Sequence, residues 1–146
     1  MSGIIVGVDG SGHSQRALEC AMREAAIRQV PLTVITVSEA IRGYYTDMTV
    51  FPDDAARTEE VRQLAQAETD KVLAGLDEPR PASVTVKAVH GFPVEELIDA
   101  GKDADMIVVG SRGAGGFTRL MMGSVAGQVV QHAYCPVLVV PPAEHA

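Results

Sequence analysis

Residues 106–125 read MIVVGSRGAGGFTRLMMGSV, an apolar run followed by a glycine-rich segment and the start of a helical pattern. The run Met106–Val109 has no polar residue, which is typical of a parallel strand covered on both faces. A helix is expected from about Ser124 to Ala133. A strand that leads through glycines into a helix can hold phosphate groups, because glycine lets backbone N–H groups approach an anion and the helix N-terminus favours negative charge. This stretch therefore predicts an α/β domain with a nucleotide site at the turn.

The rest of the chain repeats the pattern of a strand followed by a helix. Strands that alternate with helices predict a mainly parallel sheet with helices on both faces, in one domain of residues 1–146. The segment from Ser38 to Pro52 has no clear period and is expected to be a functional or mobile loop. The expected strands are Ile4–Val8, Leu32–Val37, Ser83–Val89 and Val137–Val140, and the other expected helices run from Ser11 or Ser14 to Gln29, from Asp54 to Leu73 and from Pro93 to Gly101.

Helical spacing predicts which sides of two helices face the core. Aromatic residues make up only 4% of the chain and Trp is absent, so this core is expected to be aliphatic. The residues with core spacing are Leu18, Ala21, Met22 and Ala25 in the first helix and Val61, Leu64, Ala65 and Val72 in the second.

The charge distribution separates the glycine-rich segment from the rest of the chain. The net charge of −7 argues against non-specific nucleic-acid binding, which needs a basic face. From Met106 to Ala143 there is no Asp or Glu, whereas Arg112 and Arg119 are present. This locally positive region suits an anion.

Cellular location is predicted from the cysteines and from hydropathy. Cys20 and Cys135 are far apart and lack metal-binding spacing, so reduced thiols in a cytoplasmic protein are expected. The first residues form a strand pattern without a basic region, so no signal peptide is expected. No apolar run approaches the roughly 18 residues that a membrane span requires.

The glycines of the segment follow the spacing Gly110-x2-Gly113-x9-Gly123-Ser124. We expect the N–H groups of Gly113, Gly123 and Ser124 to face phosphate oxygens, with the Ser124 hydroxyl as a further donor. Arg112 lies inside the segment and can pair with phosphate. The alternative is that the glycines serve only turns and close packing.

Asp9 follows the first strand, at the carboxyl edge of the expected sheet. In doubly wound sheets ligands bind outside the carboxyl ends of the strands, where the strand order reverses. If the first and fourth strands are neighbours, Asp9 and Gly110 meet in one crevice. Asp9 can then accept a hydrogen bond from a ribose hydroxyl or help to hold a metal ion, or it can be an ordinary turn residue. The sequence supports no Ser/His/Asp or Cys/His arrangement and no carboxylate pair near the glycines, so binding is favoured over catalysis.

With these motifs, nearly the whole chain resembles the universal stress protein family. The resemblance is carried by Ile4–Ser11, Gly91–Pro93, Gly110–Gly113 with Gly123–Val125, and Cys135–Val140. The glycine spacing is that of the ATP-binding branch, so the resemblance implies ATP binding. It further implies that Val8, Asp9 and Val37 contact the adenosine, that Val109 lines the pocket, and that Gly110, Gly113, Gly123, Ser124 and Val125 hold the ribose and phosphates.

The same resemblance implies a fold and a function. The fold is a Rossmann-like, adenine nucleotide alpha hydrolase-like domain whose five-stranded parallel sheet has the order 3-2-1-4-5. The expected function is that of an ATP-binding regulator or sensor in stress response, with Mg²⁺ or Mn²⁺ bound through the phosphates and an unknown regulatory protein as partner. A homodimer is implied through Val137, Leu138, Val139 and Val140. Three alternatives stay open: a cyclic-AMP-binding member, a weak ATP-hydrolysing enzyme that uses Asp9, and an interaction module that binds no nucleotide.

Overall fold

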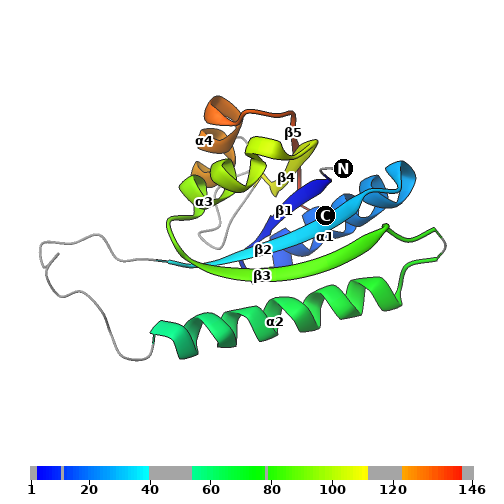
Figure 1. Cartoon of the computed structure of the whole chain (residues 1–146), viewed down its shortest axis with the longest axis horizontal. Helices are drawn as coiled ribbons and strands as arrows, with labels where there is room; N and C mark the ends of the chain where they lie inside the picture. Colours follow the sequence, from blue (N-terminus) through cyan, green and yellow to red (C-terminus); the bar gives the residue numbers. More distant parts are fainter. Residues whose placement is uncertain (1–2, 11, 40–53, 78, 112–122, 143–146) are drawn as a thin grey trace, which may run out of the picture.

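Five parallel strands form one sheet in the order β3-β2-β1-β4-β5 (Figure 1). The computed structural model describes residues 3–10, 12–39, 54–77, 79–111 and 123–142. The predicted parallel sheet and its strand order are confirmed, and β2, β3 and β4 each run one or two residues past the predicted carboxyl end. The strands are β1 (Ile4–Val8), β2 (Pro31–Glu39), β3 (Ser83–Gly91), β4 (Met106–Gly110) and β5 (Val137–Val140).

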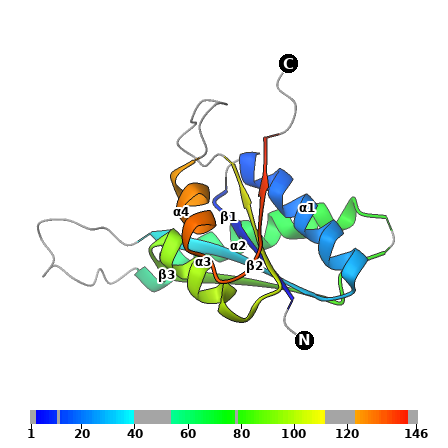
Figure 2. The same cartoon turned by 90° about the horizontal axis from the view of Figure 1, so that it is seen from above.

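Helices cover both faces of the sheet, as predicted. One face carries α1 and α2, and the other carries α3 and α4, an arrangement that can be followed in Figure 1 and Figure 2. Each helix connects two parallel strands, which is the connection that a parallel sheet requires. The helices are α1 (Gly12–Arg28), α2 (Asp54–Ala74), α3 (Pro93–Ala100) and α4 (Ser124–His132), with a short 3₁₀ helix, η1 (Gly101–Asp103), after α3.

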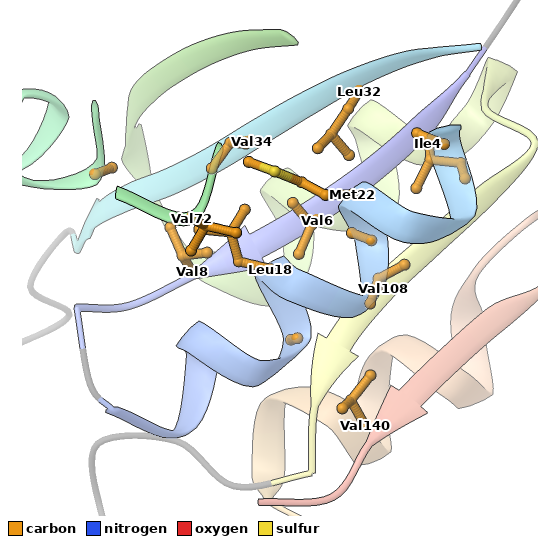
Figure 3. Close-up of a cluster of buried hydrophobic side chains, with 14 of the residues drawn as sticks. Ile4, Val6, Val8, Leu18, Met22, Leu32, Val34, Val72, Val108 and Val140 are labelled. Carbon is orange, nitrogen blue, oxygen red and sulfur yellow. The ribbon is translucent and has the colours of Figure 1, made fainter. Parts of the chain in front are cut away.

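The larger core lies between the sheet and the helices α1 and α2. Figure 3 shows Leu18 and Met22 of α1 and Val72 of α2 in one cluster with the β1 side chains Val6 and Val8. All four side chains predicted for the α1 stripe have an exposed fraction of 0%. Burying each large aliphatic side chain stabilises the fold by about 1.5–3 kcal/mol, so this stripe holds α1 on the sheet.

The prediction of which α2 residues face the core is partly wrong. Leu64 is 69% exposed, whereas Thr69, which the sequence pattern did not select, is fully buried. The buried stripe runs through Ala65, Thr69 and Val72, and Leu64 lies about 100° around the helix from Ala65. The Thr69 hydroxyl donates a hydrogen bond of 2.7 Å to the carbonyl of Ala65, so its burial leaves no polar group unsatisfied.

Both ends of α1 are tied to neighbouring elements by side chains. The helix was expected to start at Ser11 or Ser14; α1 begins at Gly12, and Ser14 lies buried in its first turn. Its hydroxyl accepts a hydrogen bond of 3.3 Å from the Asp9 N–H. After the last turn, Gln29 adopts the left-handed conformation (φ 54°), and its amide donates to the carbonyls of Ala26 and Arg80 at 2.8 and 2.9 Å.

Several expectations concern features outside the sheet. The first two residues of the predicted loop, Ser38 and Glu39, belong to β2, and residues 40–53 lie outside the described part of the chain. Cys20 and Cys135 are unpaired and half-buried, and burial raises the pKa of the Cys135 thiol. Among the described residues, none of the helices combines the length and the apolar character needed to cross a membrane.

Candidate functional site

The strands β1 and β4 are neighbours, but their pairing stops before their carboxyl ends. The register runs from Ile4–Met106 to Val6–Val108, two residues short of Val8 and Gly110, where the strands end. The sheet order reverses between these strands, since the chain builds outward from β1 to β3 and then crosses to β4. Such a switch point is where doubly wound sheets bind their ligands.

On its other side, β4 stays paired with β5 to the end. Gly110 is in register with Val140, and the Ser111 N–H donates to the Val140 carbonyl at 2.8 Å. The separation at the carboxyl edge is therefore specific to β1 and β4. The predicted neighbourhood of the first and fourth strands is confirmed, and Asp9 and Gly110 stand at the ends of these two adjacent strands.

The N-terminus of α4 lies beside the crevice, the region between the carboxyl ends of β1 and β4. Gly123 is the N-cap residue, and its carbonyl accepts a hydrogen bond of 2.9 Å from the Gly127 N–H. The N–H groups of residues 124–126 precede this bond, so they are the donors that a helix N-terminus offers to an anion. Ser124 is exposed and carries a hydroxyl at the same place, while Val125 is half-buried against the α3/α4 core.

The Gly123 N–H has a different role from the predicted one. It donates to the Ser111 carbonyl at 2.6 Å, so in this structure the group does not face a phosphate. The bond joins the two described ends of the glycine-rich segment and thereby places the N-terminus of α4 beside the end of β4. Arg112 and Gly113, which belong to the predicted phosphate site, lie outside the described residues, as does Arg119.

The side chains of two predicted binding residues are buried in the core. Val109 is 3% exposed and packs in the α3/α4 core, and Val8 is 6% exposed and packs in the α1/α2 core. At the crevice these residues can therefore offer only their backbone groups. Asp9 differs from both, because its side chain is exposed.

Strand β2 extends past the carboxyl end of its neighbour β1. Val8, the last residue of β1, is in register with Thr36, whereas β2 continues through Val37 to Glu39 and stays paired with β3 on its other edge. The β1-facing backbone edge of β2 thus extends past the end of β1. Backbone N–H and C=O groups on such an edge can form hydrogen bonds with the acceptors and donors of a planar base. The Val37 side chain is half-buried against the α3/α4 core.

The two sides of the switch point differ in charge. The β4/α4 side belongs to the part of the chain that has no Asp or Glu, whereas Asp9 lies on the β1 side. Burial, and after it the Asp9 charge, raises the pKa of Glu68 in α2, while Lys71 lowers this pKa.

The described residues do not assemble a metal site from protein side chains alone. Within these ranges no group of three or more His, Cys, Asp and Glu side chains is placed to hold a metal ion. His90 and His132 are exposed.

Comparison with known sequences identifies one family. The profile of the universal stress protein family matches residues 1–141. A universal stress protein of Mycobacterium tuberculosis is 33% identical over 140 residues, which cover 94% of this chain and 47% of that protein. The chain therefore spans about half the length of the curated relatives that it matches.

Comparison with solved structures leads to the same family. A universal stress protein crystallised in complex with cAMP shares 25% identity and a TM-score of 0.66, with 96% of each chain covered. The universal stress protein from Archaeoglobus fulgidus in complex with dAMP shares 26% identity and a TM-score of 0.63, covering 95% of this chain and 97% of that one. Sequence and fold agree over almost the whole length, and the chain belongs to the universal stress protein family.

Proposed function

We propose that this protein binds ATP in the crevice between β1 and β4 and acts as a nucleotide-dependent regulator or sensor in stress response. The observation that carries the proposal is the early end of the β1–β4 pairing, with the N-terminus of α4 on an acid-free wall beside it. The phosphates lie against the N–H groups of residues 124–126 and the Ser124 hydroxyl. Gly110, Arg112 and Gly113 complete the phosphate site from the glycine-rich segment, and Gly123 holds that segment against α4.

The opposite wall suits the nucleoside. Asp9 is an exposed hydrogen-bond acceptor at the end of β1, which is what ribose hydroxyls require. The adenine ring pairs with the backbone edge of β2 at Val37, beyond the end of β1. Val8 and Val109 contribute backbone, since their side chains are buried. In this orientation the negative phosphates point away from Asp9. The charge difference between the two sides of the site therefore determines the orientation of the nucleotide.

The ligand class is supported by relatives in which an adenine nucleotide is bound. The two solved complexes contain cAMP and dAMP, which have in common with ATP the adenine ring, a pentose (2′-deoxyribose in dAMP) and one phosphate group. The full glycine spacing, which the resemblance assigns to the ATP-binding branch, favours a ligand with more phosphates. A cyclic-AMP-binding protein is the second candidate, and the cAMP complex of a relative favours it.

Hydrolysis is not needed for the proposed role. Asp9 is the sole described carboxylate that directly follows β1 or β4, and the described residues hold no three-ligand metal group. Mg²⁺ or Mn²⁺ would therefore be held through the nucleotide phosphates, where it would offset their negative charge. If the protein is instead a weak ATP-hydrolysing enzyme, its turnover depends on the metal ion and is lost in Asp9→Asn.

Calorimetric titration of the nucleotide-free protein tests the proposal. We expect micromolar or tighter binding of Mg-ATP, weaker binding of ADP and cyclic AMP, and rejection of GTP, whose ring presents a different set of donors and acceptors to the β2 edge. Tighter binding of cyclic AMP than of ATP would favour the second candidate. If none of these nucleotides binds, the glycines are structural and the chain is an interaction module.

A second copy of the chain is the partner that we propose for β5. This strand is at the edge of the sheet, and Val137, Leu138 and Val139 are only half-buried there. Tyr134, just before the strand, is 70% exposed. An open apolar edge pairs readily with another strand, and a two-fold dimer would cover it. Sedimentation equilibrium is expected to give twice the chain mass of 15.4 kDa, whereas a monomer would contradict this interface.

Two further features of the role remain predictions. In the proposed role ATP orders the glycine-rich segment and so changes a surface that an unknown regulatory protein reads. A cytoplasmic location is predicted, and the two unpaired cysteines agree with a reducing compartment.

A further inference from the structure

We infer that a relay of backbone hydrogen bonds through Ser111 and Gly123 couples the nucleotide site to β5, so that pairing of β5 with a second copy of the chain raises the affinity for the nucleotide. The inference rests on the proposed function, because it joins the phosphate site at α4 to the proposed β5 interface. It adds a regulation of that site, since nucleotide binding and the oligomeric state then depend on one another.

Three consecutive hydrogen bonds connect the first turn of α4 to the end of β5. The Gly127 N–H donates to the Gly123 carbonyl at 2.9 Å, and the Gly123 N–H donates to the Ser111 carbonyl at 2.6 Å. The Ser111 N–H in turn donates to the Val140 carbonyl at 2.8 Å. Gly123 and Ser111 thus each use both their N–H and their C=O in the relay, so the position of the first turn of α4 depends on the position of β5.

The relay is largely shielded from water. Gly123 is buried, Val140 is 4% exposed and Ser111 is half-buried. A buried backbone group that loses its partner cannot bond to water instead, and this loss costs about 1–3 kcal/mol. Because residues 124–126 directly follow Gly123, the relay fixes the direction of the N–H groups that the phosphates require.

The end of the relay at β5 gains most from a partner. This strand has only four residues, Val137–Val140, and β4 is its single neighbour among the described strands. A strand that is hydrogen-bonded on one side only opens locally at a lower free energy than the centre of a sheet. Pairing of its outer side with a second strand would hold β5 in place and, through the relay, Ser111 and Gly123.

The outer side of β5 is complementary to itself. On the inner side, β4 donates to the carbonyls of Pro136 and Val140 at 3.0 and 2.8 Å. Because the backbone groups of successive residues alternate between the two sides of a strand, the N–H and C=O groups of Val137 and Val139 point outward. In an antiparallel pair of two β5 strands, Val137 of one copy and Val139 of the other exchange hydrogen bonds, and the two-fold axis passes at Leu138.

Pairing of β5 removes part of the ordering cost of nucleotide binding. In a single copy, the phosphates have to fix α4, the relay and β5 together, and the entropy lost in doing so lowers the affinity. In the pair, β5 is already held. The coupling is reciprocal, because pairing raises the nucleotide affinity by the same factor by which the nucleotide raises the pairing affinity. We expect this factor to be at least about fivefold, the lower end of typical couplings.

Amide hydrogen exchange of the nucleotide-free protein tests the relay. The variant Val139→Pro removes an outward N–H of β5, keeps the bonds to β4 and should prevent pairing. We expect the Ser111 and Gly123 amides to exchange faster in this monomer than in the wild-type dimer, while amides in the centre of the sheet, such as Val34, exchange at the same rate. Equal rates at Ser111 and Gly123 would refute the relay. Dilution of the wild-type protein to the monomer repeats the comparison without a substitution.

The coupling factor is measured from both directions. Calorimetric titration compares the affinities of the wild-type dimer and of Val139→Pro for Mg-ATP. Sedimentation velocity compares the dissociation constant of the wild-type dimer with and without saturating Mg-ATP. Both ratios should be equal and at least about fivefold. If both ratios are one, nucleotide binding and pairing are independent and the coupling is refuted.

Gly123→Pro and Gly123→Ala form a matched pair that isolates one bond of the relay. Gly123 has φ −62° and ψ 156°, which alanine and proline both adopt without strain, and only proline lacks the N–H that donates to Ser111. In nucleotide-free Gly123→Ala, pairing should still slow exchange of the Gly127 amide. In Gly123→Pro the dimer should form without this effect. The same slowing in both variants would show that the bond to Ser111 does not transmit the coupling.

The outcomes separate the inference from the proposed function. If no nucleotide binds the wild-type protein, the proposed function fails, and calorimetry alone shows it. If ATP binds but the chain is a monomer at every concentration, the nucleotide site stands, whereas the β5 interface and the coupling both fail. If ATP binds and the dimer forms, but the wild-type protein and Val139→Pro bind ATP equally well, only the coupling is refuted.

Discussion

Replacement of Gly113 by valine is expected to abolish ATP binding while leaving the fold intact. Gly113 is the second glycine of the motif, in the segment whose ends are joined by the bond from Gly123 to Ser111. A branched side chain there would keep the backbone from approaching the phosphates. We expect an affinity loss of at least about hundredfold, which corresponds to about 2.7 kcal/mol. Calorimetric titration with Mg-ATP measures the loss.

Gly75→Val is the matched control for this experiment. Gly75 follows α2, and a Cβ atom placed there would lie 3.8 Å from the nearest neighbouring atom, at ordinary contact distance. This variant should bind ATP like wild type, so a loss seen only in Gly113→Val belongs to the site. Equal and unchanged affinity in both variants would remove the phosphate interpretation of the glycine motif. Circular dichroism of each variant checks that the secondary structure is retained.

Replacement of Gly3 by alanine is expected to lower the free energy of unfolding by about 3 to 5 kcal/mol, the combined cost of backbone strain and overpacking. Gly3 has φ 119°, which side chains rarely adopt, and a Cβ atom there would lie 2.5 Å from the carbonyl oxygen of Pro31. The backbone cannot move away easily. The Gly3 N–H donates to an Asp105 carboxylate oxygen at 2.9 Å, and the Asp105 N–H donates to the Gly3 carbonyl at 2.8 Å.

Urea unfolding without nucleotide measures this cost, and Gly10→Ala is its control. Gly10 also has a positive φ, 82°, but a Cβ atom placed there would have no neighbour within 4 Å. This control should lose only the backbone term, about 1–2 kcal/mol. Equal losses in the two variants would mean that the contact with Pro31 is relieved by a small shift. If the free energy of unfolding of Gly3→Ala equals that of the wild type within experimental error, the amino end of β1 is not anchored as described.

The strands and helices could be predicted from local sequence patterns. The continuous apolar runs of β1 and β5 and the strand before the glycines are found where they were predicted. The stripe of α1 was predicted correctly because large apolar residues and alanines recur with helical spacing on one side only. On α2 the same rule selected Leu64 over Thr69, because a hydropathy pattern cannot show that a threonine hydroxyl will bond to its own helix.

The candidate site was predictable in outline and not in detail. The motif located the glycine segment and the N-terminus of α4, since both depend on residues close together in the sequence. It assigned the Gly123 N–H to a phosphate, whereas that group bonds to Ser111. The raised pKa of Glu68 was not predicted, because the burial of this carboxyl depends on how α2 lies across the sheet.

The sequence by itself determined the strands and helices, their alternation, the parallel sheet and the family, because periodicity and turn chemistry are properties of neighbouring residues. Only the tertiary structure decided where the pairing of β1 and β4 ends, how far β2 extends past β1, and which residues of α2 are buried against the sheet. These features join residues far apart in the chain. Their proximity is set by strand register and helix packing. Both depend on how side chains are buried throughout the core, so no single stretch of sequence encodes them.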